Sequence, residues 1–282
     1  MSEVDALSMD VNNNDVAVLI DGLNKKGGGA DGLSGISLSI TKKGTHGILG
    51  PRGSGKTALL DAISGTVPFD DGSIEIFGNV ITPNLAKSLK SAELASIKKR
   101  VGYVRGEDGF YPEMTASETL EFIGKVKGVE SGKLTRQIKE ALSLVGLDNY
   151  GDVLVVNLDI YSRRLLAIAA SLLGNPDVIL VDEPYVFTLG EMREKREHIY
   201  GILTMLGRIK TVIVATSDFD VAKAVCSDVA IISAGKLLAV GSFEELEGRL
   251  AEKGGATLKE LYKSLTVTSV NSAFDTENGG KE

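Results

Sequence analysis

The chain has 282 residues, 43% of them hydrophobic, and carries 31 Lys and Arg against 38 Asp and Glu, a formal net charge of −7. This length and apolar content suffice for one large domain or two closely associated lobes. The acidic balance argues against a general nucleic-acid binder, which needs surplus Lys and Arg to displace counterions from phosphates. The single cysteine, Cys226, excludes an internal disulfide and fits a reducing cytosol.

The ends of the chain and its apolar runs exclude two further classes. No apolar run approaches the roughly 18 residues that a membrane-spanning helix needs. The first residues, MSEVDALSMDVNNND, have neither a basic nor an apolar region of the kind a signal peptide carries. We therefore expect a cytoplasmic protein. Residues 1–15 and 267–282 are polar and are predicted to be disordered tails around one domain, 16–266.

Between these tails, strand-like and helix-like segments alternate. Short apolar stretches rich in β-branched residues predict strands, and apolar residues recurring every three or four positions predict helices. The predicted strands are 16–21, 35–41, 45–50, 73–78, 101–104, 178–181, 211–216 and 228–233. The predicted helices are 56–63, 85–100, 116–129, 131–146, 162–174, 190–208 and 220–225. Three consecutive helices between 116 and 174 interrupt the alternation and predict a helical lobe inserted at about 105–175.

A complete phosphate-loop pattern, G-x-x-x-x-G-K-[ST], occupies residues 50–57. Its glycines let successive backbone N–H groups curl around a phosphate, and the following helix presents its positive end. A chance glycine-rich turn is the competing interpretation in a chain with 33 glycines, but the predicted strand before it and helix after it are the context that the motif requires. The expected nucleotide contacts are Gly50, Pro51, Arg52, Gly53, Ser54, Gly55, Lys56, Thr57 and Ala58.

A second motif, VILVDEP, spans residues 178–184. Two adjacent carboxylates after a buried strand are unfavourable unless a cation or other partner accompanies them. Beside a phosphate loop, Asp182 is expected to hold Mg²⁺ together with the Thr57 hydroxyl. Glu183 is expected to be the general base for an attacking water, with Lys56 on the phosphates. A solvated loop is the alternative for an Asp-Glu pair that stands alone.

These motifs predict an α/β fold of the P-loop NTPase type. Continuous apolar strands such as 178–181 and 211–216 are typical of a parallel sheet that is buried on both faces. The early strands, 16–21 and 35–41, predict an antiparallel β subdomain beside this mostly parallel core. The inserted helical lobe completes the predicted architecture.

The chain resembles the ATP-binding subunits of ABC transporters from residue 16 to about 266. The resemblance implies MgATP binding, a homodimer or heterodimer of ATPases, integral membrane permease partners and a peripheral place on the inner face of the cell membrane. The tail 242–266 looks like the drug, sodium or polysaccharide exporter branch. The segments that carry the resemblance are GILGPRGSGKTALLDAISG (47–65), GSIEIFG (72–78), VGYVRGEDGFYPEMTASETLEF (101–122), SRRLLAIAASLLGNPDVILVDEP (162–184) and TVIVATSDFDVAKAVCSDVAIISAGKLLAVGS (211–242).

Five positions depart from the family pattern. The signature loop L-S-G-G-Q, which clasps the partner's nucleotide, aligns with Leu158–Ser162, where Ile and Tyr block close backbone approach and Asp159 adds a like charge. The switch histidine aligns with Ser217, which cannot carry a charge to a phosphate. The glutamine of the Q-loop aligns with Gly106, the aspartate-bearing loop with Tyr185–Gly190, and the adenine-stacking aromatic with glycines around Gly27.

These departures predict nucleotide binding with slow or absent hydrolysis. They also keep a second interpretation open, a degenerate, non-hydrolytic regulatory half of a heterodimeric transporter. A non-transport P-loop protein acting on ribosomes or DNA is a weaker alternative, because neither a second cassette nor a long coiled coil is present. His46 and His198 lack a partner at metal-ligand spacing, so both are expected to be surface or packing residues.

Overall fold

The computed structural model describes residues 15–27, 32–88, 90–107, 109–184, 193–252 and 257–264. Ten strands in this part of the chain form two sheets. The smaller sheet is antiparallel, with the order β2-β1-β4-β5. Its strands are β1 (Val16–Lys25), β2 (Leu33–Thr41), β4 (Asp71–Ile76) and β5 (Asn79–Ile81). The predicted antiparallel β subdomain is therefore confirmed.

The larger sheet has the order β10-β9-β3-β8-β7-β6. All of its pairings are parallel except that between β9 and β10, which confirms the predicted, mostly parallel core. Because parallel strands end at the same edge of a sheet, the residues that follow β3 and β7 come together there. The strands are β3 (Gly44–Leu49), β6 (Val101–Val104), β7 (Val178–Asp182), β8 (Thr211–Thr216), β9 (Asp228–Ser233) and β10 (Lys236–Ser242).

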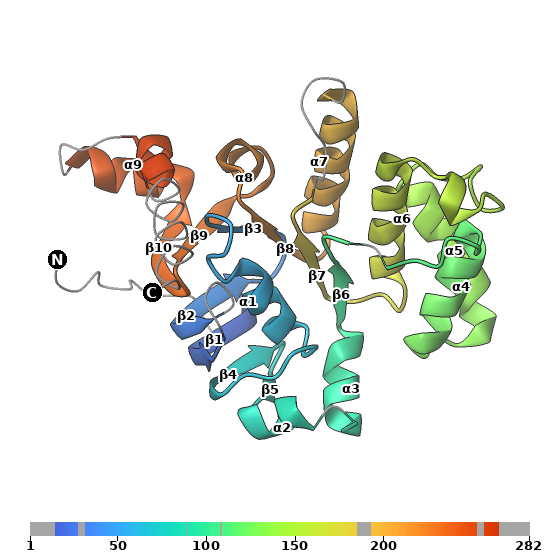
Figure 1. Cartoon of the computed structure of the whole chain (residues 1–282), viewed down its shortest axis with the longest axis horizontal. Coiled ribbons are helices and arrows are strands. Elements are labelled where there is room, and N and C mark those ends of the chain that lie inside the picture. Colours follow the sequence, from blue (N-terminus) through green and yellow to red (C-terminus); the bar gives the residue numbers. More distant parts are fainter. Residues whose placement is uncertain are drawn as a thin grey trace, which may run out of the picture.

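Helices cover both faces of this sheet and form a separate group at one end of the molecule (Figure 1). That group contains α4, α5 and α6 and lies beyond β6 and β7, within the range predicted for the inserted lobe. The helices are α1 (Lys56–Ile63), α2 (Pro83–Lys87), α3 (Ala92–Lys99), α4 (Ala116–Val126), α5 (Ser131–Leu144), the 3-10 helix Val155–Asn157, α6 (Ile160–Leu172), α7 (Arg193–Gly207), α8 (Phe219–Val225) and α9 (Phe243–Glu252). A last helix, 258–264, is here called the C-terminal helix.

Two apolar cores lie on opposite faces of the larger sheet. Strand β8 shows how they divide, because Val212 and Val214 enter one core while Ile213 and Ala215 enter the other. The first core joins the sheet to the helical lobe, α7, α8, α9 and the C-terminal helix. The second lies between the sheet, α1, α3 and the antiparallel subdomain. Burial on both faces explains why the strand reads as a continuous apolar run.

The single helix predicted for 85–100 is wrong, because the structure has two shorter helices, α2 and α3. The Thr82 hydroxyl accepts a hydrogen bond from the Leu85 amide at the start of α2, and Ser91 does the same for Leu94 in α3. A side-chain cap satisfies backbone N–H groups that a helix cannot, so each cap starts a new helix. The sequence interpretation did not include β5, β10, α9 or the C-terminal helix.

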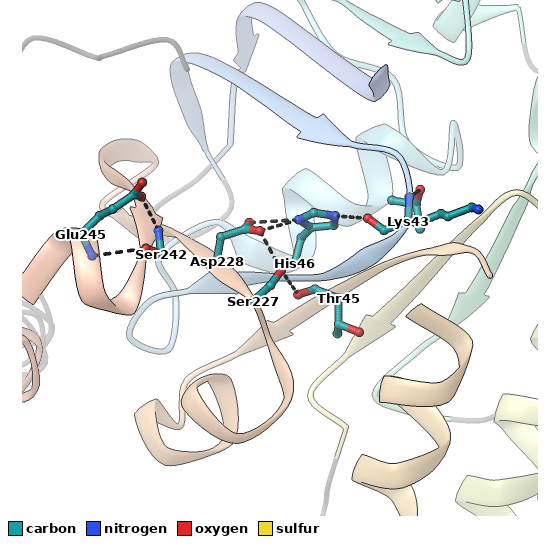
Figure 2. A network of polar contacts seen from close by, with 8 residues as sticks. Lys43, Thr45, His46, Ser227, Asp228, Ser242 and Glu245 are labelled. Carbon is teal, nitrogen blue, oxygen red and sulfur yellow. Dashed lines mark hydrogen bonds and ion pairs between the residues drawn. The ribbon is translucent and has the colours of Figure 1, made fainter. Parts of the chain in front are cut away.

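His46 is buried where β3, β9 and the turn before β3 meet (Figure 2). Its Nδ1 lies 2.9 and 3.0 Å from the two carboxylate oxygens of Asp228, and its Nε2 lies 2.8 Å from the carbonyl oxygen of Lys43. Both neighbours are acceptors, so a fully bonded ring carries a proton on each nitrogen. Burial alone lowers the pKa of His46, but the Asp228 carboxylate and backbone carbonyls outweigh burial and leave the pKa raised.

This charged histidine predicts a pH-dependent part of the stability. Because its pKa is higher in the folded protein, the stabilisation is fully present below the unfolded value of about 6.5 and is lost as pH rises through the folded value. In His46→Asn we expect the fall in unfolding free energy between about pH 6 and about pH 9 to be smaller by about 1.5–3 kcal/mol, the contribution of hydrogen bonds to a charged group. Urea unfolding of both proteins at the two pH values measures the difference, and parallel pH profiles would contradict it.

Candidate nucleotide-binding site

The phosphate loop joins the end of β3 to the start of α1, and its glycines are required by the backbone. A side chain at Gly50 would place its first carbon 2.2 Å from the carbonyl oxygen of Ile232. Gly53 and Gly55 have φ values of 72° and 98°, in the region that favours glycine. The turn between β9 and β10 supports the loop, because the Gly235 amide donates to the Ser54 carbonyl at 3.0 Å. The loop is therefore shaped by neighbours on β9 and the β9–β10 turn as well as by its own residues.

Lys56 lies buried under this loop. Its ammonium donates to the carbonyl oxygens of Gly50 and Pro51 at 2.9 and 3.0 Å, and lies 4.0 Å from a carboxylate oxygen of Glu183. Burial lowers the pKa of Lys56, and the carboxylates of Glu183 and Asp182 oppose that effect. The structure thus brings the predicted phosphate-binding lysine and the predicted base together from segments far apart in the sequence.

Asp182 and Thr57 meet at the carboxyl ends of β7 and β3. The Thr57 hydroxyl donates to Oδ2 of Asp182 at 2.8 Å. The other oxygen, Oδ1, is buried and has no hydrogen-bond partner among the residues that the structure describes. Burial raises the pKa of Asp182, the Thr57 hydroxyl opposes this, and Glu183 adds to it. A hydroxyl beside a carboxylate with one unsatisfied oxygen is a donor set that fits Mg²⁺, which prefers oxygen ligands.

Glu183 turns back toward the end of β8. Its φ of 43° is unusual for a residue with a side chain, and its amide donates to the Ala215 carbonyl at 2.8 Å. The carboxylate accepts the Thr216 hydroxyl at 3.1 Å and the Ser217 amide at 2.9 Å. Such strained backbone persists only where the surroundings hold it, and it concentrates at functional sites. Two donors, one from the last residue of β8 and one from the residue after it, therefore orient the predicted base.

Arg164 is a member of this site that the sequence interpretation missed. Its buried guanidinium donates to the carbonyl oxygens of Asp182 and Glu183, each at 2.6 Å, and to that of Pro184 at 3.3 Å. It also donates to the Arg105 carbonyl at the end of β6. One side chain from α6 thus fixes the backbone that carries both carboxylates. An arginine inside the apolar helix 160–172 was the available signal, since buried arginines need many acceptors.

The residues aligned with the signature loop are engaged within the chain itself. Asp159 caps α6 by accepting the Ser162 amide at 2.7 Å, and its other oxygen pairs with Lys195 of α7 at 3.0 Å. The Lys195 ammonium lies 4.9 Å from the centre of the Tyr161 ring, whose hydroxyl bonds His198. A carboxylate therefore already occupies the positive end of α6.

Three of the four remaining departures from the family pattern fall on residues that the structure describes. Ser217 contacts Glu183 through its backbone amide, not its side chain. Gly106 follows Arg105, whose guanidinium pairs with Asp61 of α1 at 2.9 Å. Gly27 is exposed after β1. The segment Tyr185–Gly190 lies outside the described residues.

A glycine-rich loop between a parallel strand and a helix, facing an acidic strand end, defines a P-loop nucleotide-binding protein. Comparison with known proteins narrows this class: the family described as "ABC transporter" matches residues 33–186. The linearmycin resistance ATP-binding protein LnrL of Bacillus subtilis is 32% identical over 243 residues, which are 86% of this chain and 72% of that protein. The chain belongs to the ABC transporter family, as one of its ATP-binding subunits.

Other relatives and solved structures agree with this assignment. The Nod factor export ATP-binding protein I of Ralstonia nicotianae is 29% identical over 244 residues, covering 86% of this chain and 71% of that protein. A dimeric ATP-binding cassette in a post-hydrolysis state, bound to ADP and Pi, superposes with a TM-score of 0.67 at 26% identity, covering 80% of this chain and 98% of that one. An ABC transporter ATP-binding subunit with a TM-score of 0.72 and 19% identity, covering 89% of this chain and 99% of that one, supports the fold alone.

The described part of the chain contains no helix with the length and apolar character to traverse a bilayer.

Proposed function

We propose that this ABC ATP-binding subunit binds MgATP at Gly50–Ala58 and Asp182 and drives transport by separate membrane permease subunits. The observation that carries the proposal is the partly buried hydrogen bond between Thr57 and Asp182, with one aspartate oxygen left to ligate a cation. Lys56 and Glu183 lie 4.0 Å apart beside it. Calorimetric titration of the purified chain with ATP and magnesium tests the proposal, and a lack of saturable heat on folded protein would refute it.

Each residue has one task in this mechanism. The backbone amides of Gly53 to Lys56 surround the β-phosphate, and Lys56 exchanges its bonds to loop carbonyls for β- and γ-phosphate oxygens. Thr57 and Asp182 hold the magnesium ion, which when bound neutralises charge on the phosphates. Glu183 accepts the proton of the attacking water. These roles follow from the side-chain chemistry at the observed positions.

We further propose that hydrolysis is slow. Ser217 supplies a neutral side chain where the family pattern has a histidine, and Asp159 places a carboxylate where a partner's nucleotide would approach. Removing a single positioned donor typically lowers kcat by about 10²- to 10³-fold. We therefore expect steady-state phosphate release below about 0.1 s⁻¹, against a usual range that begins near 1 s⁻¹. Lys56→Ala gives the background, and turnover of about 1 s⁻¹ or more would contradict the expectation.

The hydrogen bond and the ion pair of Asp159 within the chain favour a second candidate function, a regulatory half of a heterodimer. Lys195 and the Ser162 amide occupy both oxygens of Asp159, so this face is engaged before any partner arrives. In such a pair, an ATPase with a complete signature loop would supply the hydrolysing site. Co-purification from native cells distinguishes the candidates: a second, sequence-complete ATPase favours the hetero-pair, and a permease with two copies of this chain favours the homodimer.

The proposed location is the inner face of the cell membrane, where the chain is held by permease subunits. The relatives named for linearmycin resistance and Nod factor export favour an exporter. Sedimentation of membranes, followed by detergent extraction and affinity capture, tests this placement. The chain is expected to sediment with membranes only when its permease is present. Sedimentation that is independent of any membrane protein would contradict it.

A further inference from the structure

The C-terminal helix packs against the segment that follows β8. Tyr262 is buried, and its ring lies 6.0 Å from that of Phe219 at the start of α8. Phe219 in turn meets Phe243 of α9 edge-on at 5.7 Å. These aromatic contacts place the C-terminal helix in the same core as the central sheet. The helix lies outside residues 33–186, the part that matches the family.

The Tyr262 hydroxyl reaches the catalytic edge of the sheet. It donates to the carbonyl oxygen of Ser217 at 2.7 Å, while the amide of the same serine donates to the Glu183 carboxylate at 2.9 Å. Burial and the nearby carboxylates of Glu183 and Asp218 raise the pKa of Tyr262, so the hydroxyl keeps its proton and acts as a donor. A three-membered chain therefore runs from Tyr262 through Ser217 to Glu183.

The ion pair between the C-terminal helix and α8 is too exposed to do the same. Lys259 pairs with Asp220 at 2.5 and 2.7 Å, but its side chain is 44% exposed and that of Asp220 is 71% exposed. Exposed ion pairs hold geometry weakly because water screens them and the side chains lose entropy. Tyr262 is thus the contact of this helix that can hold the Ser217 backbone in a defined position.

We propose that Tyr262 is a positioning residue for the general base, holding Ser217 so that its amide orients the Glu183 carboxylate. The C-terminal helix thereby controls the geometry of a site built by other elements. The inference rests on the proposed function only for the role of Glu183. The hydrogen bond between Tyr262 and Ser217 stands independently of that role.

The test compares the full chain with Tyr262→Phe, which removes one hydroxyl and keeps the ring. Amide hydrogen exchange is followed by NMR, and hydrolysis by single-turnover assay with protein in excess over MgATP. In the variant we expect the Ser217 amide to exchange roughly tenfold faster, with β8 amides unchanged. The single-turnover rate is expected to fall about three- to tenfold, while the Kd for MgATP stays within about twofold. Tyr150→Phe, at an exposed tyrosine of the helical lobe, is the matched control.

A purely structural role would not produce this division between rate and affinity. Equal Ser217 exchange in the variant and the wild type would overturn the proposal, and so would a wild-type rate in Tyr262→Phe alongside an impaired Glu183→Gln. If Glu183→Gln hydrolyses ATP like the wild type, the assignment of the base under the proposed function fails and the catalytic part of this inference fails with it. The exchange measurement then still decides whether Tyr262 holds the Ser217 backbone.

Discussion

In Lys56→Ala, MgATP affinity is expected to fall by about 10- to 100-fold, because hydrogen bonds to a charged group contribute about 1.5–3 kcal/mol. The buried ammonium donates to the carbonyl oxygens of Gly50 and Pro51 and forms a longer ion pair, at 4.0 Å, with Glu183, so phosphate oxygens can replace the two carbonyls. Isothermal titration calorimetry with magnesium and ATP measures the change.

Lys139→Ala is the control for this substitution. Lys139 is an exposed lysine of α5 in the helical lobe, and its removal changes net charge by the same amount. We expect Lys139→Ala to leave the affinity for MgATP within about twofold of wild type, because salt largely screens charges that are exposed to solvent. Equal affinities for Lys56→Ala and Lys139→Ala would show that the loop does not bind the phosphates.

Asp182→Asn is expected to abolish the contribution of magnesium to ATP binding while leaving the fold intact. The substitution keeps the size of the side chain and an oxygen for the Thr57 hydroxyl, but removes the negative charge beside the unsatisfied oxygen. Loss of groups that support a metal ligand lowers metal affinity by about 10- to 100-fold, and loss of the ligand's charge should do at least as much.

Thermal unfolding with ATP in magnesium and in EDTA reports this effect. The wild type should gain about 2.7 kcal/mol at a MgATP concentration of 100 times its Kd, and the variant should gain the same small amount in both solutions. Asp177→Asn is the matched control. Asp177 lies just before β7, at the end of the strand opposite Asp182, and pairs with Arg100. A full magnesium response in Asp182→Asn would assign the metal to other residues.

Much of the architecture could be predicted because short-range patterns determine it. Strands 178–181 and 211–216 are continuous apolar runs, and both lie in the parallel sheet as β7 and β8. The division of 85–100 into two helices was missed because Ser91 fits a helix interior as well as a cap when only periodicity is considered. The C-terminal helix was missed because it is stabilised by packing against α8, which is distant in the sequence.

The candidate site was likewise predicted in part from the sequence. Asp182, Glu183 and the phosphate loop were identified from two contiguous motifs, and the structure brings them to one edge of the sheet. The place of Arg164 in an apolar helix indicated burial, but its role could not be assigned because its partners are carbonyl oxygens, which every residue possesses and no sequence pattern marks. The role of Tyr262 was hidden for the same reason, since it bonds the backbone of Ser217.

The sequence by itself determined the chemistry of this protein, because a phosphate loop needs its glycines, lysine and hydroxyl at neighbouring positions along one strand and helix. Only the tertiary structure decided how that chemistry is oriented. The hydroxyl of Tyr262, the guanidinium of Arg164 and the Asp228 partner of His46 act on groups that are distant in the chain. The first two contacts arise where parallel strands end at one edge and helices cover them, and the third arises where β3 and β9 pair in parallel. Local residue patterns carry no record of that proximity.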